Sequence, residues 1–393
     1  MDSVTFYQKD DTLYLALSGR IDAANAQSVY DAMVSAREQS AAEKLVVDAK
    51  ELEYISSAGL RVLLKLRKSE PTLRVINVCS DVNEILEMTG FTEIIPVEKA
   101  MRELSVDGCE IIGQGAKGTV YRYDPETVLK VYHDPDCLPE IRAERELARK
   151  AFVLGVPTAI SFDVVRVGEC YGTMFELIDA RSLSQIMTEQ PGEMERNVKD
   201  FADILRGIHA VETDDASLPE ARDLALRWVA MAKNFLPAAT AAALEELVRE
   251  APVCSGLIHG DYHSNNLLVQ NGEILLIDMA TLSRGLPVFE LANICYAYET
   301  LAEVDPENVA AFLDMPQALY SQVWGLFLPR YLGTEEEEKI RAADRTSRLM
   351  AYTRLLYHFG RRGGESTETG RRAIALGREK IPALLAQTKT LVI

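Results

Sequence analysis

The sequence predicts a chain of two parts, a small α/β domain at residues 1–105 followed by a larger α+β region at residues 106–393. In the first part, apolar strand-like runs alternate with helical patterns, which is typical of helices packed on a sheet. The second part begins with β-prone runs around a glycine-rich segment, at residues 106–180, and has helical apolar periodicity at residues 181–393. A length of 393 residues also exceeds one typical core.

The composition is that of an ordinary globular protein, with 48% hydrophobic and 26% charged residues. A formal charge of −18 argues against general binding to nucleic acid or to an anionic membrane, because both need a basic face. No apolar run approaches the ~18 residues of a membrane span, and the acidic N-terminus lacks the apolar core of a signal peptide. Six scattered cysteines without a C-x-x-C pair indicate neither a disulfide framework nor a zinc site, and favour the reducing cytoplasm.

Three strands and three helices are expected in the first part. The strands are short apolar runs bounded by polar or turn residues, and the helices show apolar spacing of i, i+3, i+4 or a run of helix formers. In chain order we expect strand 13–17, helix 23–39, strand 45–47, helix 57–68, strand 73–78 and helix 81–89, which stops at Gly90.

Two serines, Ser56 and Ser57, stand where a strand turns into a helix. A serine at this place can cap the free backbone N–H groups of the helix, which is a sufficient structural explanation. The same place also favours a phosphate, because the helix dipole and the free amides attract negative charge. The residues alone leave both interpretations open.

Residues 1–105 resemble a STAS domain, the anti-sigma factor antagonist family. The resemblance is carried by Gly19-Arg20-Ile21-Asp22 and by the segment YISSAGL at 54–60. It implies an α/β fold, a protein partner, and phosphorylation of Ser57 by a partner kinase, which switches the binding of that partner. Ser56 stands where many members carry Asp, a departure that bears on the phosphorylation of Ser57 and not on the fold.

The glycines Gly113, Gly115 and Gly118 form the pattern G-x-G-x-x-G-x-V, which Val120 completes. Rossmann folds, kinases and ordinary turns all contain such glycines, so the context decides. Here they lie between two β-prone runs and not at the start of a helix. We therefore expect a hairpin whose tip brings its amides against the phosphates of a nucleotide, with no Cβ in the way.

Lys130 lies ten positions after Val120, in an apolar strand at 128–132. An ammonium directed from such a strand into a cleft can hold ATP phosphates, whereas on a half-exposed strand it would be solvated. The glycine loop upstream favours the first interpretation. Glu144 and Glu146 on the following helix are the candidate partners of Lys130, and Glu146 is preferred.

Two further strands, 162–167 and 171–177, are expected to complete this strand-rich region. The chain must then cross into the helical region. Backbone groups of Glu176 and Ile178, at this crossing, are the candidates for contacts with adenine.

The segment His-Gly-Asp-Tyr-His-Ser-Asn-Asn at 259–266 precedes a short hairpin that ends at Asp278. An Asp, an Asn five positions later and a second Asp can place one carboxylate beside a substrate hydroxyl and two oxygen ligands on Mg²⁺. We therefore predict Asp261 as the catalytic base, and Asn266 with Asp278 as the Mg²⁺ ligands. The alternative is a hairpin with polar ends that turns at Asn271-Gly272.

Other side chains of the second part allow two interpretations each. His259 is expected to support the loop, His263 to contact substrate or solvent, and His209 to pack in the core rather than to bind a ligand. An arginine series is either a site for an anionic partner or a salt-bridged helix face; its members are Arg341, Arg345, Arg348, Arg354, Arg361 and Arg362. Four aromatic residues could form a cage for a quaternary ammonium or belong to the core; they are Trp228, Tyr296, Tyr298 and Trp324.

The second part resembles the aminoglycoside phosphotransferase and choline kinase branch of the protein-kinase-like superfamily. GQGAKGTV, VLK, ERE, HGDYHSNN and LIDM carry the resemblance, in that order. It implies a bilobal fold with ATP and Mg²⁺ in the cleft. The chain has Asp278-Met279-Ala280 in place of Asp-Phe-Gly, and only 12 positions separate Asp278 from Glu290. This leaves little room for a segment that docks peptides and favours a small-molecule hydroxyl acceptor.

Together these features predict an ATP-dependent O-phosphotransferase with an N-terminal STAS domain that binds a regulatory partner. Lys130, paired with Glu146, would orient the phosphates. Mg²⁺ on Asn266 and Asp278 would neutralise developing charge, while Asp261 positions the hydroxyl. Two alternatives stay open: a signalling kinase that phosphorylates a STAS serine, either Ser57 or that of a partner, and a nucleotide-sensing scaffold without turnover.

Overall fold

In the computed structural model, which describes residues 4–115, 117–178, 180–270 and 272–393, the N-terminal part is built on one sheet. Its strands lie in chain order: β1 (Val4–Lys9), β2 (Thr12–Ile21), β3 (Lys44–Ile55), β4 (Arg74–Val78) and β5 (Val97–Lys99). β1 is antiparallel to β2, and the other neighbours are parallel. Each parallel pair therefore needs a crossover connection.

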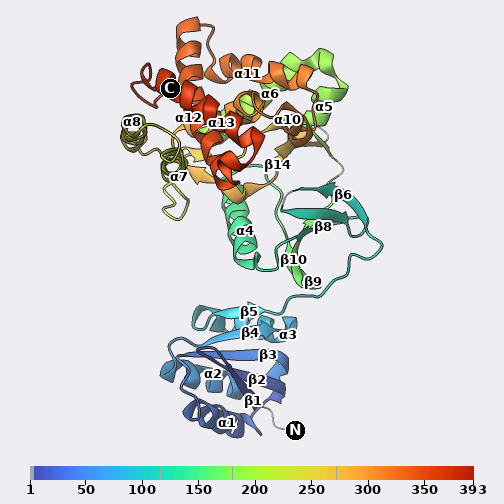
Figure 1. Ribbon diagram of the computed structural model, residues 1–393. Helices are drawn as coiled ribbons and strands as arrows, with labels where there is room; N and C mark the ends of the chain where they lie inside the picture. Colours follow the sequence, from blue (N-terminus) through green and yellow to red (C-terminus); the bar gives the residue numbers. More distant parts are fainter. Residues whose placement is uncertain (1–3, 116, 179, 271) are drawn as a thin grey trace. The chain divides into compact units, whose positions relative to one another are not determined.

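The three crossovers contain α1 (Ala26–Glu38), α2 (Ser57–Ser69) and α3 (Ser80–Met88), as Figure 1 shows. Alternate residues of β2, Leu13, Leu15 and Leu17, are buried, while the residues between them are partly exposed. Helix residues such as Met33 and Leu63 complete the same core. The predicted α/β fold of this part is thus confirmed. β1 and β5 were not predicted, because their residues are mostly exposed or half-exposed and lack a clear apolar run.

The second part begins with a five-stranded sheet in the order β6-β7-β8-β10-β9. Its elements are β6 (Glu110–Gln114), β7 (Gly118–Arg122), β8 (Thr127–Tyr132), β9 (Asp163–Val167), β10 (Cys170–Glu176) and the helix α4 (Leu138–Val153). The pairs β6–β7, β7–β8 and β8–β10 are antiparallel. By their contacts, the residues of the chain divide into a unit of 1–105 with 164–169 and a unit of 106–163 with 170–393.

The helical region contains two small sheets among many helices. The strands are β11 (Arg181–Ser182), β12 (Leu257–Ile258), β13 (Leu267–Gln270), β14 (Glu273–Leu276) and β15 (Ser283–Arg284). β13 and β14 form the predicted hairpin, since Gln270 pairs with Glu273. Of its two loop residues, Asn271 lies outside the described residues, and Gly272 has a φ of 85°.

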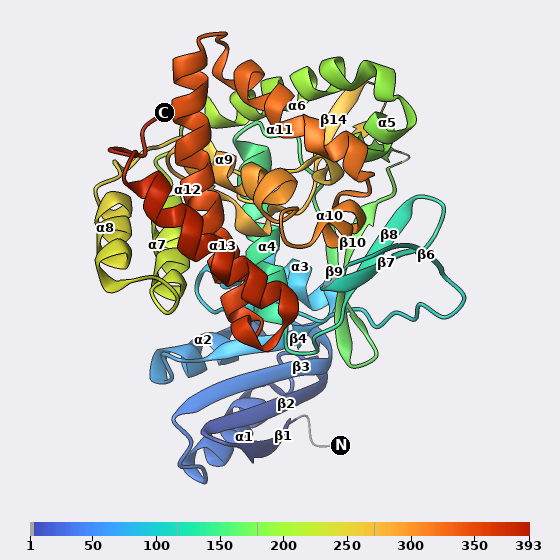
Figure 2. The ribbon, with the colours of Figure 1, turned by 45° about the horizontal axis from the view of Figure 1, so that its top comes forward.

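Nine α-helices are described in this region: α5 (Leu183–Glu189), α6 (Met194–His209), α7 (Ala221–Ala232), α8 (Ala238–Arg249), α9 (Pro287–Cys295), α10 (Pro306–Leu313), α11 (Gln317–Leu332), α12 (Glu337–Arg361) and α13 (Glu368–Leu385). Phe201, Leu205 and Ile208 lie on one buried face of α6. α12 packs against α7, α9 and α13 (Figure 2). None of the helices in the described part of the chain combines the length and apolarity of a membrane span.

Candidate active site

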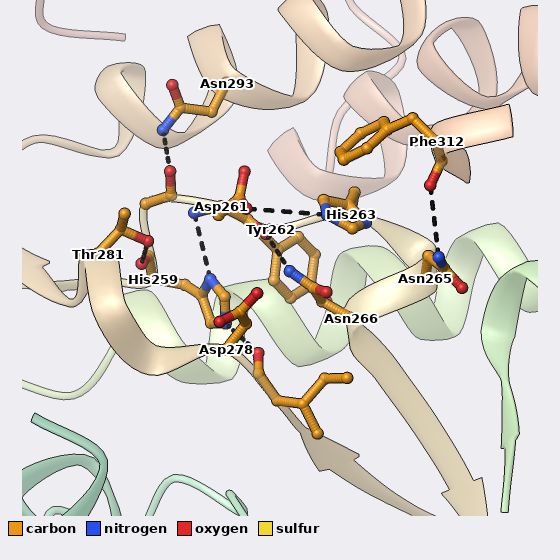
Figure 3. A network of polar contacts seen from close by, with 12 residues as sticks. His259, Asp261, Tyr262, His263, Asn265, Asn266, Asp278, Thr281, Asn293 and Phe312 are labelled. Carbon is orange, nitrogen blue, oxygen red and sulfur yellow. Dashed lines mark hydrogen bonds and ion pairs between the residues drawn. The ribbon is translucent and has the colours of Figure 1, made fainter. Parts of the chain in front are cut away.

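The segment at 259–266, called the catalytic segment after its predicted base Asp261, is held in place chiefly through its backbone. The backbone N–H of Gly260 donates to both oxygens of the Glu290 side chain, at 2.9 and 3.1 Å, and the N–H of Tyr262 lies 3.4 Å from one of them. Asn293 donates from Nδ2 to the Gly260 carbonyl at 2.8 Å (Figure 3). Glu290 is fully buried. Burial raises its pKa, while hydrogen bonds from backbone N–H groups counteract part of this effect.

Gly260 is required by its conformation and by its surroundings. Its φ is +85°, and a Cβ at this position would lie 2.5 Å from the carbonyl oxygen of Thr281. A side chain here would therefore push the 281 backbone away from the loop. Thr281 is itself tied to the segment, because its hydroxyl donates to the His259 carbonyl at 2.9 Å.

His259 connects the catalytic segment to the end of the hairpin. Its Nδ1 accepts the N–H of Asp261 at 3.2 Å, and its Nε2 lies 3.2 Å from the carbonyl of Ile277. Since one nitrogen accepts and the other faces a carbonyl, the neutral ring with its proton on Nε2 satisfies both contacts. The expected supporting role of His259 has this physical basis. It links the backbone of Asp261 to the residue before Asp278.

Asp261 presents its carboxylate at a partly exposed position, with 36% of the side chain accessible. The Nδ2 of Asn266 donates to the Asp261 carbonyl at 2.9 Å, which directs Oδ1 of Asn266 away from that carbonyl. Figure 3 shows Asp261, Asn266 and Asp278 close to one another, on the loop after β12, before β13 and after β14. The structure thus brings together the three residues that were predicted to act on hydroxyl and metal.

Asp278 adopts a left-handed backbone conformation, with φ 68° and ψ 59°. Such a conformation costs energy for a residue other than glycine, and aspartate is among the side chains that tolerate it best. Burial would raise the pKa of Asp278, but Lys130 and Lys117 outweigh this effect and the pKa lies below its ordinary value. Asp278 is therefore ionised at neutral pH, as an oxygen ligand of Mg²⁺ must be.

Lys130 lies between two carboxylates, with Nζ 3.4 Å from Glu144 and 3.5 Å from Asp278. Burial lowers the pKa of Lys130, but Asp278 and Glu144 outweigh it, so that the pKa is raised above its ordinary value. The hydroxyl of Tyr132 also donates to Glu144, at 3.4 Å. Through its contact with Asp278, Lys130 thus connects β8 to the residues that follow the β13–β14 hairpin.

The prediction that Glu146 pairs with Lys130 is wrong. Glu146 contacts Arg149 at 3.1 Å, and half of its side chain is exposed. Residues two positions apart on a helix point about 200° apart, so only one of the two glutamates can face β8. Glu144 lies on the buried side of α4, with Ile141 and Ala148, and is the partner of Lys130.

The glycine loop forms the expected hairpin of β6 and β7, with Ala116 outside the described residues. Gly118 is required by packing, because a Cβ there would lie 2.5 Å from the Val131 carbonyl of the neighbouring strand, and its predicted phosphate contact stays a prediction. A Cβ at Gly113 or Gly115 would make only ordinary contacts, at 3.6 Å from Val120 and 3.9 Å from Gly118, so crowding does not require glycine at either position. Val120 pairs with Lys130 across the sheet.

The crossing between the lobes follows the last residue of β10, Glu176, which pairs with Thr127. The N–H of Leu177 donates to the Glu126 carbonyl at 2.7 Å, and the Ile178 carbonyl accepts from Ala180 at 2.9 Å. The adenine contacts predicted for the backbone of Glu176 and Ile178 stay a prediction. Asp179, between the last two residues, lies outside the described residues.

Two of the ambiguous histidines have defined surroundings. His263 is buried against Phe312, at 4.5 Å between ring centroids, so its expected alternative of contact with solvent is wrong. Burial lowers its pKa to about 4. Its Nε2 lies 3.9 Å from Asp261, beyond hydrogen-bond range. His209 accepts or donates at Nδ1 to the hydroxyl of Tyr331, at 2.7 Å.

Arg354 of α12, which the sequence placed in the arginine series and not beside Asp261, lies next to that carboxylate. Its guanidinium lies 3.6 Å from the Asp261 carboxylate and over the rings of Tyr296 and Trp228, at 4.8 and 5.7 Å. These two aromatic residues thus flank a cation, but one that belongs to the chain itself. The other two cage candidates are structural: Tyr298 bonds Ser264 at 2.7 Å and Trp324 donates to Asp344 at 2.7 Å.

The other arginines of the series do not form one basic stripe. Arg341 pairs with Glu337, and Arg348 contacts Asp344 and Glu299 at 2.9 and 3.0 Å. These two arginines belong to a salt-bridged helix face, as one of the two interpretations expected. Arg354 instead lies beside Asp261 of the catalytic segment.

Ser57 is the first residue of α2 and is exposed. The residue that caps the helix is Ser56, whose hydroxyl accepts the N–H of Ala58 at 3.2 Å. The neighbouring Gly59 packs closely, since a Cβ there would lie 2.6 Å from Ile55. The capping role is therefore filled by Ser56 and leaves the Ser57 hydroxyl available for modification.

Two family models match the chain. The model of the phosphotransferase enzyme family (APH) matches residues 108–324, and that of the STAS domain matches residues 3–104. Among curated proteins, a protein of Bordetella bronchiseptica that is described as an anti-sigma factor antagonist, BtrV, is 35% identical over 98 residues. That match covers 24% of this chain and 84% of BtrV.

Solved structures of aminoglycoside phosphotransferases are similar to the chain at low identity. A thermostable mutant of APH(4)-Ia without ligand is 17% identical with a TM-score of 0.48, and the match covers 71% of this chain and 94% of that one. APH(2'')-Ib with ADP bound is 14% identical with a TM-score of 0.47, covering 76% and 98% of the two chains.

Proposed function

The chain belongs to the phosphotransferase enzyme family and carries an N-terminal STAS domain, and we propose that it transfers the γ-phosphate of ATP to a hydroxyl group of a small molecule. The observation that carries the proposal is the position of Lys130 between Glu144 and Asp278. A cation held beside the predicted metal ligand is the arrangement that binds nucleotide phosphates.

The residues present fit a nucleotide with Mg²⁺. Asp278 offers an ionised carboxylate and Asn266 an amide oxygen, which are the hard oxygen ligands that Mg²⁺ prefers. When bound, Mg²⁺ would neutralise the charge that develops on the phosphate oxygens during transfer. Lys130 would hold the phosphates, with Glu144 and Tyr132 keeping its ammonium in place. The glycine hairpin would cover the phosphates with its amides.

Asp261 would act on the acceptor. Its carboxylate accepts a hydrogen bond from the acceptor hydroxyl and takes the proton as the hydroxyl oxygen forms a bond with the γ-phosphorus. The bond between the γ-phosphorus and the oxygen that bridges it to the β-phosphorus breaks, and ADP leaves. The backbone contacts of Gly260 and Tyr262 with Glu290 hold this carboxylate at a fixed place, so that no reorganisation is needed.

The test is an ADP-release assay with purified protein and a panel of hydroxyl compounds, comparing the wild type with Asp261→Asn. Loss of the base lowers kcat by about 10²- to 10⁴-fold, while the exposed control Asp223→Asn of α7 keeps the wild-type rate. An Asp261→Asn protein with full activity would refute the assignment. A protein that binds ATP but turns over none of the panel would support the scaffold alternative.

A second candidate function is favoured by the exposed Ser57, which leaves the capping of α2 to Ser56. In this case the acceptor is a STAS serine, of this chain or of a protein partner. Intact-mass measurement after incubation with ATP and Mg²⁺ distinguishes the two functions. One added phosphate that is lost in Ser57→Ala supports the STAS serine as acceptor, and an unchanged mass with ADP release supports the small molecule.

A further inference from the structure

Arg354 has an unusual combination of partners for an arginine beside a catalytic carboxylate. Its only described ion pair is with Asp261, at 3.6 Å. Its guanidinium makes no hydrogen bond to any described residue, and its side chain is 21% exposed. Arg348, on the same helix, instead contacts two carboxylates at 2.9 and 3.0 Å. The donors of Arg354 are thus partly accessible, and none of them is hydrogen-bonded within the described part of the chain.

Two aromatic rings hold the guanidinium in place, and no carboxylate among the residues that the structure describes accepts a hydrogen bond from it. Tyr296 and Trp228 lie against its π-surface, which leaves the donors at its edge free. The hydroxyl of Tyr296 also lacks a partner among the described residues. An arginine stacked in this way has lost side-chain entropy already, so it binds a ligand at lower cost.

A second arginine, Arg362, also acts electrostatically on Tyr296. Arg362 lies 3.0 Å from Nε2 of His358, whose ring is 5.8 Å from that of Tyr296. Burial, together with the charges of Arg362 and Arg354, lowers the pKa of His358 to about 4. His358 is therefore neutral at pH 7. Two carboxylates, Asp261 and Asp305, have the opposite effect to the arginines and raise the pKa of Tyr296.

From this geometry we infer that the acceptor carries a carboxylate or phosphate group within two or three bonds of its reacting hydroxyl, and that Arg354 binds this group. A guanidinium edge offers two parallel N–H donors that match such an anion. Because Arg354 is 3.6 Å from Asp261, an anion on its edge places a nearby hydroxyl within reach of the catalytic carboxylate. The inference rests on the proposed transfer to a small-molecule hydroxyl.

The same arrangement disfavours a polycationic acceptor. An ammonium group near Asp261 would have to approach Arg354 at similar distance, and like charges in a partly buried site repel. A neutral polyol can accept hydrogen bonds from the arginine through its hydroxyl oxygens, but these bonds are weaker than the charge-assisted bonds that an anion accepts. Charge therefore selects the acceptor class here, with Arg354 as the specificity-determining residue.

The first experiment follows ADP release by the full chain with acceptors in three charge classes: hydroxy acids and sugar phosphates, neutral polyols, and aminosugars. We expect turnover with the anionic class. Arg354→Met should raise KM for the best anionic acceptor by about 10- to 150-fold, the range for a hydrogen bond to a charged group. Its kcat should change less. Arg354→Lys should recover part of the loss, and Arg361→Met, which removes an exposed arginine bonded to Tyr357, should match the wild type.

The second experiment tests the inference by anion binding, without measuring turnover. In the presence of ADP and Mg²⁺, the dicarboxylate malonate should raise the thermal midpoint of the wild type and of Arg361→Met, but not that of Arg354→Met. Equal stabilisation of the three proteins, or a best acceptor that is neutral or cationic, would overturn the inference. If ADP binds but no class supports turnover, the proposed function fails while the malonate result still decides the role of Arg354.

Discussion

Exchanging each of two glutamates on α4 for glutamine distinguishes the partner of Lys130. The Glu144 carboxylate lies 3.4 Å from Nζ, and the two side chains are only 16% and 21% exposed. A hydrogen bond to a charged group in such a place contributes about 1.5–3 kcal/mol. Because Asp278 remains at 3.5 Å, Lys130 keeps one carboxylate and the effect stays in this range. We expect Glu144→Gln to lower kcat/KM for ATP by roughly 10- to 150-fold.

Glu146→Gln is the matched control. Glu146 contacts Arg149 on the exposed side of the same helix, where an ion pair contributes about 0–1 kcal/mol. We expect its kcat/KM for ATP to stay within about twofold of the wild type. Both values come from initial rates of ADP release at varied ATP. A larger effect of Glu146→Gln than of Glu144→Gln would refute the assignment of Glu144 to Lys130.

Three further predictions concern the catalytic loop, the metal and the helical core. Gly260→Ala should destabilise the protein by about 1–3 kcal/mol or more, because of backbone strain and collision with Thr281, and so lower the midpoint of urea unfolding. Gly272→Ala, also at φ 85° but in open space, should show only the effect of the strain. EDTA should abolish phosphotransfer and Mg²⁺ restore it, and Asp278→Asn should require roughly tenfold more Mg²⁺; unchanged Mg²⁺ dependence would remove Asp278 as a ligand. Burial lowers the pKa of His209 from 6.5 to about 3, so below pH 6.5 the unfolded chain binds a proton that the folded protein does not. The free energy of unfolding therefore falls by about 1.4 kcal/mol per pH unit between pH 6.5 and pH 3. His209→Phe should reduce the loss of stability between pH 6.5 and 4.5, and an identical loss in the variant would contradict this.

Local signals explain most of what the sequence predicted correctly. The hairpin of β13 and β14 and the end of α3 at Gly90 depend on neighbouring residues, and the structure has them where expected. The phase of α4 was also present in the sequence, because Ile141, Glu144 and Ala148 follow helical spacing. That pattern could have identified Glu144 in place of Glu146.

Other site residues depend on contacts between distant segments. Glu290 reaches Gly260 across 30 positions, and Arg354 reaches Asp261 from a helix at the far end of the chain. No periodicity or motif reports which face of α12 turns toward the loop, since that is decided by how α12 packs against α7, α9 and α13. The role of an arginine in such a series therefore becomes visible only in three dimensions.

The hydrogen bonds that hold the catalytic segment also limit how this protein could change during evolution. His259 contacts Ile277, Thr281 contacts His259, and Glu290 contacts Gly260, so residues 259–290 form a ring closed by three independent links. An insertion between Asp278 and Glu290 would have to bulge outward from this ring or break a link. New acceptor preferences can arise more readily on helices such as α12, which contribute side chains to the site from outside the ring.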